Sequence, residues 1–546
     1  MKRLVVVQAV VLTATLAFSA YGGGRNQEQS SGQGPSQSKV LNWVAPGEVT
    51  TMDSGKGYDT ISWEQIEIFT ESLYKINGNN EPVPALAAAL PAVSADGLTL
   101  TIDLRPAIAF SNGTKITAHD FVYAAQRVVD PVTGSQSANR VTYFKNAADI
   151  IAGKQPPENL GIRALSDTRL EITLTAPNPY INTELSSSLL APVNRAFVRE
   201  KGANYGLSAE NLLASGPFIL TGWNGANISW KYVKNPRYWD AANVYFDEIN
   251  VQVVKDAATG VALYEAGSLD GAAIAGEYLT VYRDAPDLVS VKTLRMTNLE
   301  LGISSNRYLQ NLNLRKALIL AVDRNELAQS ILNGDGIPSV GVIPNGIAVN
   351  PVNGKSIAED FGTLVSYNVP EAWRFFNQAL QELGVSSITL RLVTTDNDEG
   401  IKTGQYLQSV YETNLPGLKI DLANVPASVR FQEMMAYKFD LALGGWTGEF
   451  NPATYIKQFE TSNEHNHGRW VSPEITALIN ALETADGTDF SLRWEHLREA
   501  NKYLVDNVVT VPLVQAAKSY LINPKLKGYV IHVLGTPIDI TRAYFE

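Results

Sequence analysis

The chain of 546 residues contains no cysteine, has fewer basic than acidic residues, and has only five histidines. Without a thiol it can form no disulfide, no thiolate nucleophile and no cysteine-ligated zinc site. Acidic residues outnumber basic residues by 55 to 44, and the net charge of -11 argues against a nucleic-acid binder, which would carry a basic patch. Cysteine chemistry and nucleic-acid partners are therefore not expected.

Catalytic motifs are missing as well. The sequence has no Gly-x-Ser-x-Gly elbow, no phosphate-binding loop and no His-Glu-x-x-His pair. Ser304 and Ser305 lie in Leu-Gly-Ile-Ser-Ser-Asn, which lacks the elbow pattern. We therefore expect a protein that is not an enzyme and that carries no cofactor.

The composition is that of an ordinary soluble globular protein, with 45% hydrophobic and 18% charged residues. A single hydrophobic core stops growing at roughly 250–300 residues, so a chain of this length predicts two or three domains. The sequence shows no internal repeat of fixed period, which argues against a solenoid.

The N-terminus has the proportions of a secretory signal. Met1-Lys2-Arg3 precedes an apolar run over residues 4–18, which is shorter than the roughly 20 residues that span a membrane. The Ser-Ala-Tyr21-Gly-Gly-Gly that follows is similar to a bacterial lipoprotein signal, with Tyr21 in place of the lipidated cysteine. We expect a signal peptide over residues 1–20, a flexible tether over 21–39, and a protein that is secreted or attached to the outer face of the membrane.

Apolar periodicity predicts short mixed strands and helices beyond the tether. Thr117 is a plausible N-cap for a helix that carries Phe121, Ala124 and Val128, and Asp96-Gly97 is a turn into a strand. The expected strands cover residues 41–45, 98–104 and 170–175, and the other expected helical segments cover 63–74 and the Ala-rich stretch 84–90.

One stretch near the C-terminus combines an alternating apolar strand with two glycines, an aromatic residue and a carboxylate. It reads Phe439-Asp-Leu-Ala-Leu-Gly-Gly-Trp446-Thr-Gly-Glu449-Phe-Asn-Pro452. Glycine inside a strand often marks a place where a ligand or another backbone comes close. The pattern therefore indicates either a ligand site for a cation or a buried tryptophan beside a solvated glutamate.

Several blocks in a fixed order resemble the peptide-binding solute receptors of ABC importers, in the extracellular peptide/nickel-binding family. The first is the strand Leu98-Thr-Leu-Thr-Ile-Asp-Leu-Arg105, followed by Phe110-Ser-Asn-Gly-Thr and by Thr117-Ala-His-Asp-Phe121. Later blocks of the same resemblance are Asp120–Pro131, Ser215–Phe218, Lys234–Asp240, Asn313–Arg324, Trp446–Glu449, Val511–Pro512 and Lys527–Tyr529.

The resemblance implies an α/β, two-lobed periplasmic-binding-protein-like fold of class II (cluster C), with an extra domain inserted in the first lobe. Domain I would comprise residues 40–73, 206–299 and 511–546. Domain II, the insertion, would be residues 74–205, and domain III, the second lobe, residues 300–510. The resemblance also implies a monomer that binds an oligopeptide between the lobes and delivers it to the transmembrane subunits of an ABC permease.

In this family the peptide is held as an added strand, and an acidic residue of a Trp-x-x-Asp pattern pairs with its α-ammonium. Here that residue would be Glu449, one methylene longer. The ligand-binding residues implied by the resemblance are Glu449, Trp446, Gly445, Thr447, Asp59 and Thr60. No arginine lies on the strand before Trp446, only Lys438, so the sequence does not assign the group that holds the ligand carboxylate.

Two alternatives keep the same fold. The first is a receptor for peptide pheromones or other sensory peptides, which differs from a nutritional receptor in its pocket and its partner. The second is a receptor for nickel or another small solute, for which His465 and His467 beside Glu464 are the candidate ligands. Two histidines in a polar loop are more often solvated than metal-bound, so the prediction assigns no metal site.

Overall fold

The computed structural model describes residues 39–546 except 351, 448–450, 462, 464, 483–488 and 534, and it leaves out the side chains of Asp398 and Ser428. The predicted signal peptide and all of the predicted tether except Lys39 lie outside these residues. Within the described ranges, no helix has both the length and the apolar character needed to cross a membrane.

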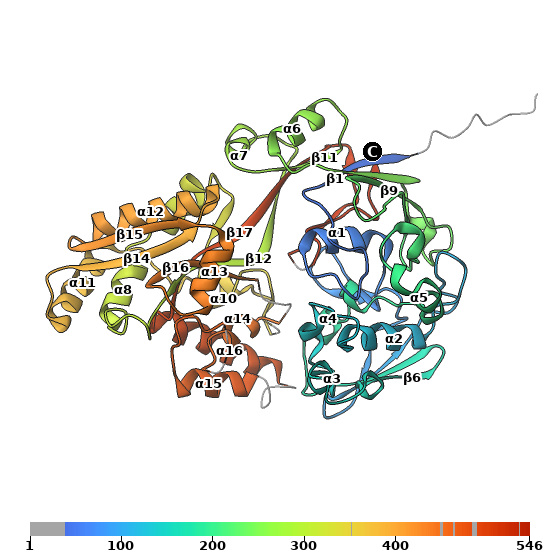
Figure 1. Cartoon of the computed structure of the whole chain (residues 1–546), viewed down its shortest axis with the longest axis horizontal. Coiled ribbons are helices and arrows are strands. Elements are labelled where there is room, and N and C mark those ends of the chain that lie inside the picture. Colours follow the sequence, from blue (N-terminus) through green and yellow to red (C-terminus); the bar gives the residue numbers. More distant parts are fainter. Residues whose placement is uncertain are drawn as a thin grey trace, which may run out of the picture. The chain divides into compact units, whose positions relative to one another are not determined.

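The strands form two four-stranded sheets and one larger sheet (Figure 1). In one four-stranded sheet the order is β1 (Val40–Ala45), β10 (Glu248–Val253), β9 (Ser229–Lys234) and β8 (Phe218–Thr221), and only the β1–β10 pair is parallel. The other is antiparallel, with the order β4 (Ala92–Val93), β5 (Thr99–Asp103), β7 (Arg169–Thr173) and β6 (Ile162–Ser166).

The seven-stranded sheet is mixed. Its strand order is β11 (Gly271–Ile274), β17 (Thr510–Ile522), β12 (Leu288–Leu301), β16 (Leu441–Thr447), β14 (Ile388–Thr395) and β15 (Leu418–Val425), and β13 (Gly336–Pro338) pairs with β17. The two-stranded ladders are β2 (Tyr74–Ile76) with β3 (Pro82–Pro84), β18 (Leu526–Lys527) with β21 (Tyr544–Phe545), and β19 (Val530–Ile531) with β20 (Ile538–Asp539).

Helices connect these strands and cover the sheets; α12, for example, packs on β14 and β15. Their bounds are α1 (Thr60–Phe69), α2 (Ala118–Val129), α3 (Ala147–Ile151), α4 (Ile181–Glu184), α5 (Arg195–Lys201), α6 (Ala257–Glu265), α7 (Glu277–Val281), α8 (Leu312–Leu320), α9 (Arg324–Glu326), α10 (Ile357–Phe361), α11 (Val369–Leu383), α12 (Asp398–Asn414), α13 (Ala427–Met435), α14 (Thr454–Lys457), α15 (Pro473–Asn480) and α16 (Phe490–Asp506). Short helical turns lie at Ala138–Val141, Pro157–Asn159, Ser188–Leu190, Gly202–Asn204, Ala209–Asn211, Ala241–Asn243 and Leu327–Ile331.

The start of α2 confirms the predicted N-cap. The backbone N–H and the hydroxyl of Thr117 both donate to Asp120 Oδ2, at 2.8 and 2.9 Å, which closes a capping box. The predicted apolar face, Phe121, Ala124 and Val128, is buried. The predicted strands at 41–45, 98–104 and 170–175 are also confirmed, as β1, β5 and β7.

The helical prediction for residues 84–90 is wrong. The backbone N–H groups of Ala85 and Leu86 instead donate to the carbonyl groups of Leu73 and Ser72, at 3.0 and 3.1 Å, which extends the β2–β3 ladder. Tertiary pairing therefore overrides the helix propensity of the alanines. The helix predicted to reach Tyr74 ends at Phe69, because Thr70 is extended, with φ -113° and ψ 154°.

Buried apolar side chains form three main clusters. One extends from Leu294 to Val514, a second from Leu73 to Leu190, and a third joins residues 41–69 to 209–251 and 520–543. Strands β12 and β17 lie side by side and contribute to both the first and the third cluster (Figure 1). Their register shifts between Lys292 and Met296 and again between Thr297 and Asn298. The division into three domains at the predicted residues stays a prediction.

Candidate ligand-binding site

A cavity of about 1310 Å³ is lined by residues that neighbour all three clusters. Drug-sized ligands occupy pockets of roughly 300–1,000 Å³, so this cavity has room for a longer molecule. Its walls come from α1 and the loop before it, from β12, β16, α12 and α14, and from the C-terminal segment 532–542.

The end of β16 presents an unpaired edge to this cavity. On one side, Leu441–Thr447 pairs antiparallel with β12 over its whole length, down to Thr447 opposite Arg295. On the other side, the described pairing with β14 covers only Leu441 and Ala442. The edge from Gly444 to Thr447 is therefore open, and Trp446 and Thr447 line the cavity. An open edge of this kind can accept an extended chain as an additional strand.

Trp446 is fixed by packing on the apolar cluster of the seven-stranded sheet. Its ring lies 4.6 Å from that of His465, centroid to centroid, at an interplanar angle of 57°. Its Nε1 is buried, and none of the described residues accepts a hydrogen bond from it. An indole N–H normally finds a partner when it is buried, so this donor is suited to an acceptor of a ligand.

The two glycines before Trp446 are explained by neighbours within the sheet. A Cβ on Gly445 would lie 2.6 Å from the carbonyl oxygen of Met296 on β12, and a Cβ on Gly444 would lie 2.6 Å from Cγ of Glu300. Close approach of another backbone, one of the two readings of a strand glycine, thus applies to Gly445. Gly445 itself is exposed but does not line the cavity.

Asp59 and Thr60 lie on the opposite wall, at the start of α1. Asp59 is the N-cap: its carboxylate accepts from the backbone N–H of Ser62 at 2.8 Å, from Ser62 Oγ at 2.7 Å and from Thr50 Oγ1 at 2.5 Å. Burial alone would raise the pKa of Asp59, but these hydrogen bonds outweigh it and lower the pKa below its usual value. The carboxylate of Asp59 therefore has a structural role as the N-cap of α1, which is independent of any contact that the Asp59 backbone makes with a ligand.

The structure thus brings four of the six predicted binding residues to one cavity. Asp59, Thr60, Trp446 and Thr447 line the same cavity. Glu449, the predicted partner of a ligand ammonium, lies outside the described residues, two positions beyond the end of β16.

The candidate metal ligands lie directly behind Trp446. The rings of His465 and His467 are 6.1 Å apart, and burial lowers the pKa of His467 to about 4. His467 Nε2 is buried and has no hydrogen-bond partner among the described residues. Within the described part of the chain, no three histidine, aspartate or glutamate side chains are grouped as metal ligands, and Glu464 lies outside it.

Sequence reasoning missed the charges on the cavity walls. Carboxylates are most numerous on the wall made by α1 and the C-terminal segment, at Glu64, Glu67, Glu71 and Asp539, although Lys75, Lys518 and Arg542 also line it. Basic side chains are most numerous on the other wall, at Lys292 and Arg295 of β12, Lys402 of α12 and Lys457 of α14, together with Asp335 and Glu399. Part of the signal for the acidic wall was present in the sequence, because Glu64 and Glu67 have the i, i+3 spacing of neighbours on one helix face, whereas Glu71 lies beyond the end of α1.

A buried polar network closes the floor of the cavity. Glu71 accepts from Tyr238 Oη at 2.5 Å and from Trp239 Nε1 at 2.6 Å. Burial raises the pKa of Glu71, and these two donors oppose that rise.

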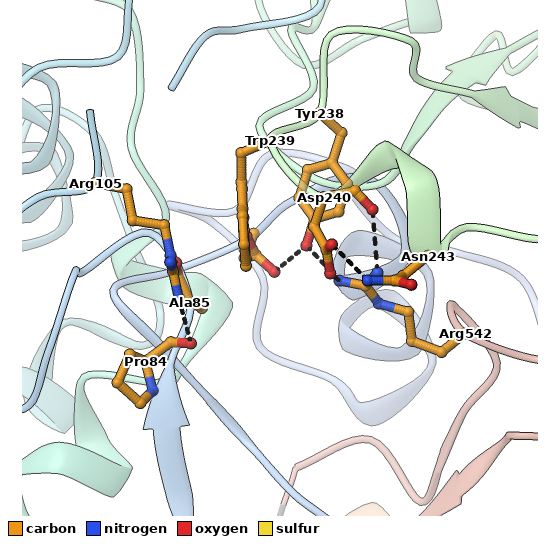
Figure 2. Close-up of polar contacts among 9 residues, drawn as sticks. Pro84, Ala85, Arg105, Tyr238, Trp239, Asp240, Asn243 and Arg542 are labelled. Carbon is orange, nitrogen blue, oxygen red and sulfur yellow. Dashed lines mark hydrogen bonds and ion pairs between the residues drawn. The ribbon is translucent and has the colours of Figure 1, made fainter. Parts of the chain in front are cut away.

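The network continues to the C-terminal segment (Figure 2). Arg542 donates to Tyr238 Oη at 3.0 Å and pairs with Asp240 at 2.6 Å. On the other side of the network, the guanidinium of Arg105 lies 3.9 Å from the ring centre of Trp239. The network therefore joins the C-terminal segment to the residues that follow α1 and β9.

Comparisons with known proteins agree with this geometry. Residues 81–467 match the family described as bacterial extracellular solute-binding proteins, family 5 Middle. A dipeptide-binding protein of Lactococcus lactis subsp. cremoris is 31% identical over 534 residues, which are 94% of this chain and 96% of that protein. The oligopeptide-binding protein OppA of Bacillus subtilis is 26% identical over 560 residues, with both chains covered completely.

Solved structures match over the same range. Listeria monocytogenes OppA bound to peptide has 32% identity and a TM-score of 0.74, covering 93% of this chain and 99% of that one. The pheromone receptor PrgZ has 34% identity and a TM-score of 0.76, covering 93% and 100%. The chain belongs to the family 5 bacterial extracellular solute-binding proteins. The predicted two-lobed α/β fold and the predicted family are confirmed.

Proposed function

We propose that this chain is an extracytoplasmic receptor that captures oligopeptides in the cavity and delivers them to the permease of an ABC importer. The observation that carries the proposal is the open edge of β16, which reaches the cavity wall at Trp446 and Thr447. Relatives named as dipeptide-binding and oligopeptide-binding proteins support the same ligand class.

The peptide adds as a strand along Gly445–Thr447. Backbone hydrogen bonds to this edge supply affinity that is independent of the peptide sequence, and the large cavity accommodates varied side chains. Trp446 Nε1 supplies a further donor from the same edge. On the facing wall, the backbone of Asp59 and Thr60 is the proposed second contact.

The two ends of the peptide are distinguished by charge. Glu449 follows the binding strand and pairs with the α-ammonium. The carboxylate is held on the basic wall, where Lys292 and Arg295 extend from β12, the strand next to β16. Each charged end of a zwitterionic ligand thus has a partner of opposite charge, which favours one direction of binding.

Predicted domains I and II form one lobe and domain III forms the other, and the two lobes close over the peptide by bending β12 and β17. These two strands contribute to two separate apolar clusters, and their register shifts between those clusters. A pair of crossing strands with an irregular ladder is suited to a hinge. We further propose that the receptor is a monomer without enzymatic activity, and that the closed form is the one that the permease recognises.

A peptide pheromone is the second candidate ligand. The solved pheromone receptor PrgZ, with 34% identity over 93% of this chain, favours it. The two functions differ in selectivity: a nutritional receptor binds many peptides with similar affinity, whereas a pheromone receptor binds one peptide far more tightly than the rest.

Titration calorimetry with a pool of short peptides, free and N-acetylated, tests the proposal. Binding of the free pool and weaker binding of the acetylated pool are expected, and Glu449→Ala should weaken binding of the free pool by at least about tenfold, since a charge-assisted pair contributes about 1.5–3 kcal/mol. Glu499→Ala on the exposed face of α16 is the control. An absence of heat with either pool would contradict the peptide receptor, and a normal affinity in Glu449→Ala would remove that residue from the site.

A further inference from the structure

One corner of the cavity, between α1 and the loop that joins β19 to β20, has features that peptide-backbone binding does not use. We name it the hairpin corner and define it by Glu67, His532, Thr536 and Asp539, which all line the cavity. The loop is held in place, since the backbone N–H of Val533 donates to Asn80 Oδ1 at 3.0 Å.

The hairpin corner and the adjoining part of α1 carry three carboxyl groups. Of the carboxylates of Glu64, Glu67 and Asp539, that of Glu64 is paired, with Lys518 Nζ at 3.1 Å. Asp539 accepts from the backbone N–H of Thr541 at 2.8 Å, and none of the ion pairs between described residues includes Asp539 or Glu67. Burial raises the pKa of Glu67 to about 7; Asp539 and Glu64 add to the rise, and Thr536 opposes it.

A deeply buried polar atom in the same corner lacks a partner. His532 is 6% exposed, and its Nδ1 has no hydrogen-bond partner among the described residues. Burial lowers the pKa of His532, so the ring is neutral and has one acceptor nitrogen. Buried polar atoms are nearly always satisfied, and His532 lies at the surface of a ligand cavity. Thr536, which is 7% exposed, interacts with Glu67.

The loop backbone brings these groups close to α1. A Cβ built on Gly535 would lie 3.7 Å from Glu67 Oε1, so the hairpin loop passes directly over that carboxylate. Two cationic side chains lie nearby: Lys518 of β17 pairs with Glu64, and Lys75 of β2 lies close enough to Glu71 and His532 to lower the pKa of both. Tyr520 of β17 is neutral, because burial raises its pKa.

The chemistry that satisfies this corner is a cation with several N–H donors. A guanidinium has five donors in a planar fork, so it can reach two carboxylates and neighbouring acceptors together, whereas an ammonium has three. We propose that the hairpin corner is a subsite for a basic side chain of the bound peptide, with arginine as the preferred residue. This inference rests on the proposed function, and it names the substrate class: peptides that carry an arginine or a lysine.

Calorimetry with matched pentapeptides tests the subsite. Pentaalanine is compared with five peptides that carry one arginine at successive positions, with lysine and with citrulline at the best position. Citrulline keeps the shape of arginine but is uncharged. The arginine peptide should bind at least about tenfold more tightly than its citrulline counterpart, since a charge-assisted contact in a desolvated site is lost.

Two variants test whether the hairpin corner causes the preference for arginine peptides. Glu67→Gln and Asp539→Asn should each reduce the arginine preference to within about threefold while pentaalanine binds as in the wild type. Glu248→Gln is the control, because that glutamate pairs with Lys231 away from the cavity. Titrations at pH 6.5 in two buffers of different ionisation enthalpy should show proton release with arginine peptide but not with citrulline peptide, since the cation ionises Glu67.

The outcomes separate the two proposals. Equal affinity for arginine and citrulline peptides at every position, or an undiminished preference in both variants, overturns the subsite while peptide binding stands. Failure of the wild-type protein to bind any of these peptides overturns the proposed function and the subsite together.

Discussion

Replacing Tyr238 with phenylalanine tests how strongly the network at the cavity floor stabilises the fold. The hydroxyl of Tyr238 donates to Glu71 Oε1 at 2.5 Å and accepts from Arg542 Nη2 at 3.0 Å. Tyr238 is 4% exposed and Glu71 is 8% exposed. A phenyl ring fills the same space, so the substitution removes these hydrogen bonds and leaves the packing in place.

The size of the effect follows from the hydrogen bonds that remain after the substitution. A hydrogen bond to a charged group contributes about 1.5–3 kcal/mol. After the substitution Trp239 Nε1 still donates to Glu71, and Arg542 keeps its ion pair with Asp240. Neither charged group loses all of its partners, so we expect the free energy of unfolding to fall by about 2 kcal/mol.

Urea unfolding followed by tryptophan fluorescence measures this change, and the chain offers a matched control. Tyr282 Oη donates to Glu265 Oε1 at the same distance, 2.5 Å, but at an exposed site. Tyr282→Phe should leave the unfolding midpoint almost unchanged, because water replaces the lost partner. Equal midpoints for the two variants would refute the assignment of stability to burial of the network.

Three further predictions concern other parts of the fold. Asp53→Ala should lower the free energy of unfolding by about 3–5 kcal/mol, because Arg127, which donates to Asp53 at 2.8 and 3.1 Å, would remain buried and unpaired. The control is Asp103→Ala, which breaks the exposed pair of Asp103 with Arg169. Similar losses of stability in the two variants would contradict the role of burial. The free energy of unfolding of the wild type should fall as the pH rises from about 4.5 to about 7, since the unfolded chain ionises Glu67 near 4.5 while the folded protein keeps it protonated up to about 7. Glu300, whose pKa is raised to about 7, and Asp335, whose pKa is raised to about 6, add to this slope. Urea titrations of Glu67→Gln should therefore show a shallower slope, and a slope equal to that of the wild type would show that Glu67 does not contribute. Gly445→Ala should lower the free energy of unfolding by about 1–3 kcal/mol in chemical unfolding and also weaken peptide binding, because its Cβ would lie 2.6 Å from the Met296 carbonyl oxygen. Gly78→Ala is the control, since a Cβ at that position would lie 3.6 Å from Val530. An unchanged stability in Gly445→Ala would contradict the close approach.

Local sequence signals predicted correctly those elements whose residue preferences agree with the contacts that the residues make in the fold. Thr117 and Asp120 are close in sequence and form their capping box without outside help, so α2 was predictable. The alanine-rich stretch 85–89 favours a helix, but the backbone of residues 85–87 pairs with Ser72 and Leu73, a contact that no propensity encodes. Leu73 fitted the helical spacing of Ile66 and Phe69, yet it is buried in a different apolar cluster.

The candidate site was predictable only along the chain segments that carry motifs. Trp446 and Thr447 follow a strand and two glycines, and their position on an open edge depends on where β14 stops pairing. The hairpin corner joins Glu67 to residues more than 460 positions later, and the basic wall joins β12 to α12 and α14. Such long-range groupings of charge depend on the tertiary fold, so local sequence patterns do not show which segments meet.

Native mass spectrometry of the protein with added short peptides tests the central claim most directly. The predicted result is a single added peptide mass per chain. This mass is lost when the peptide is N-acetylated or when the protein carries Glu449→Ala, and it is kept in Glu499→Ala. A spectrum of bare protein with every peptide at concentrations up to the millimolar range would contradict a peptide receptor and would direct the next titrations to nickel and other small solutes.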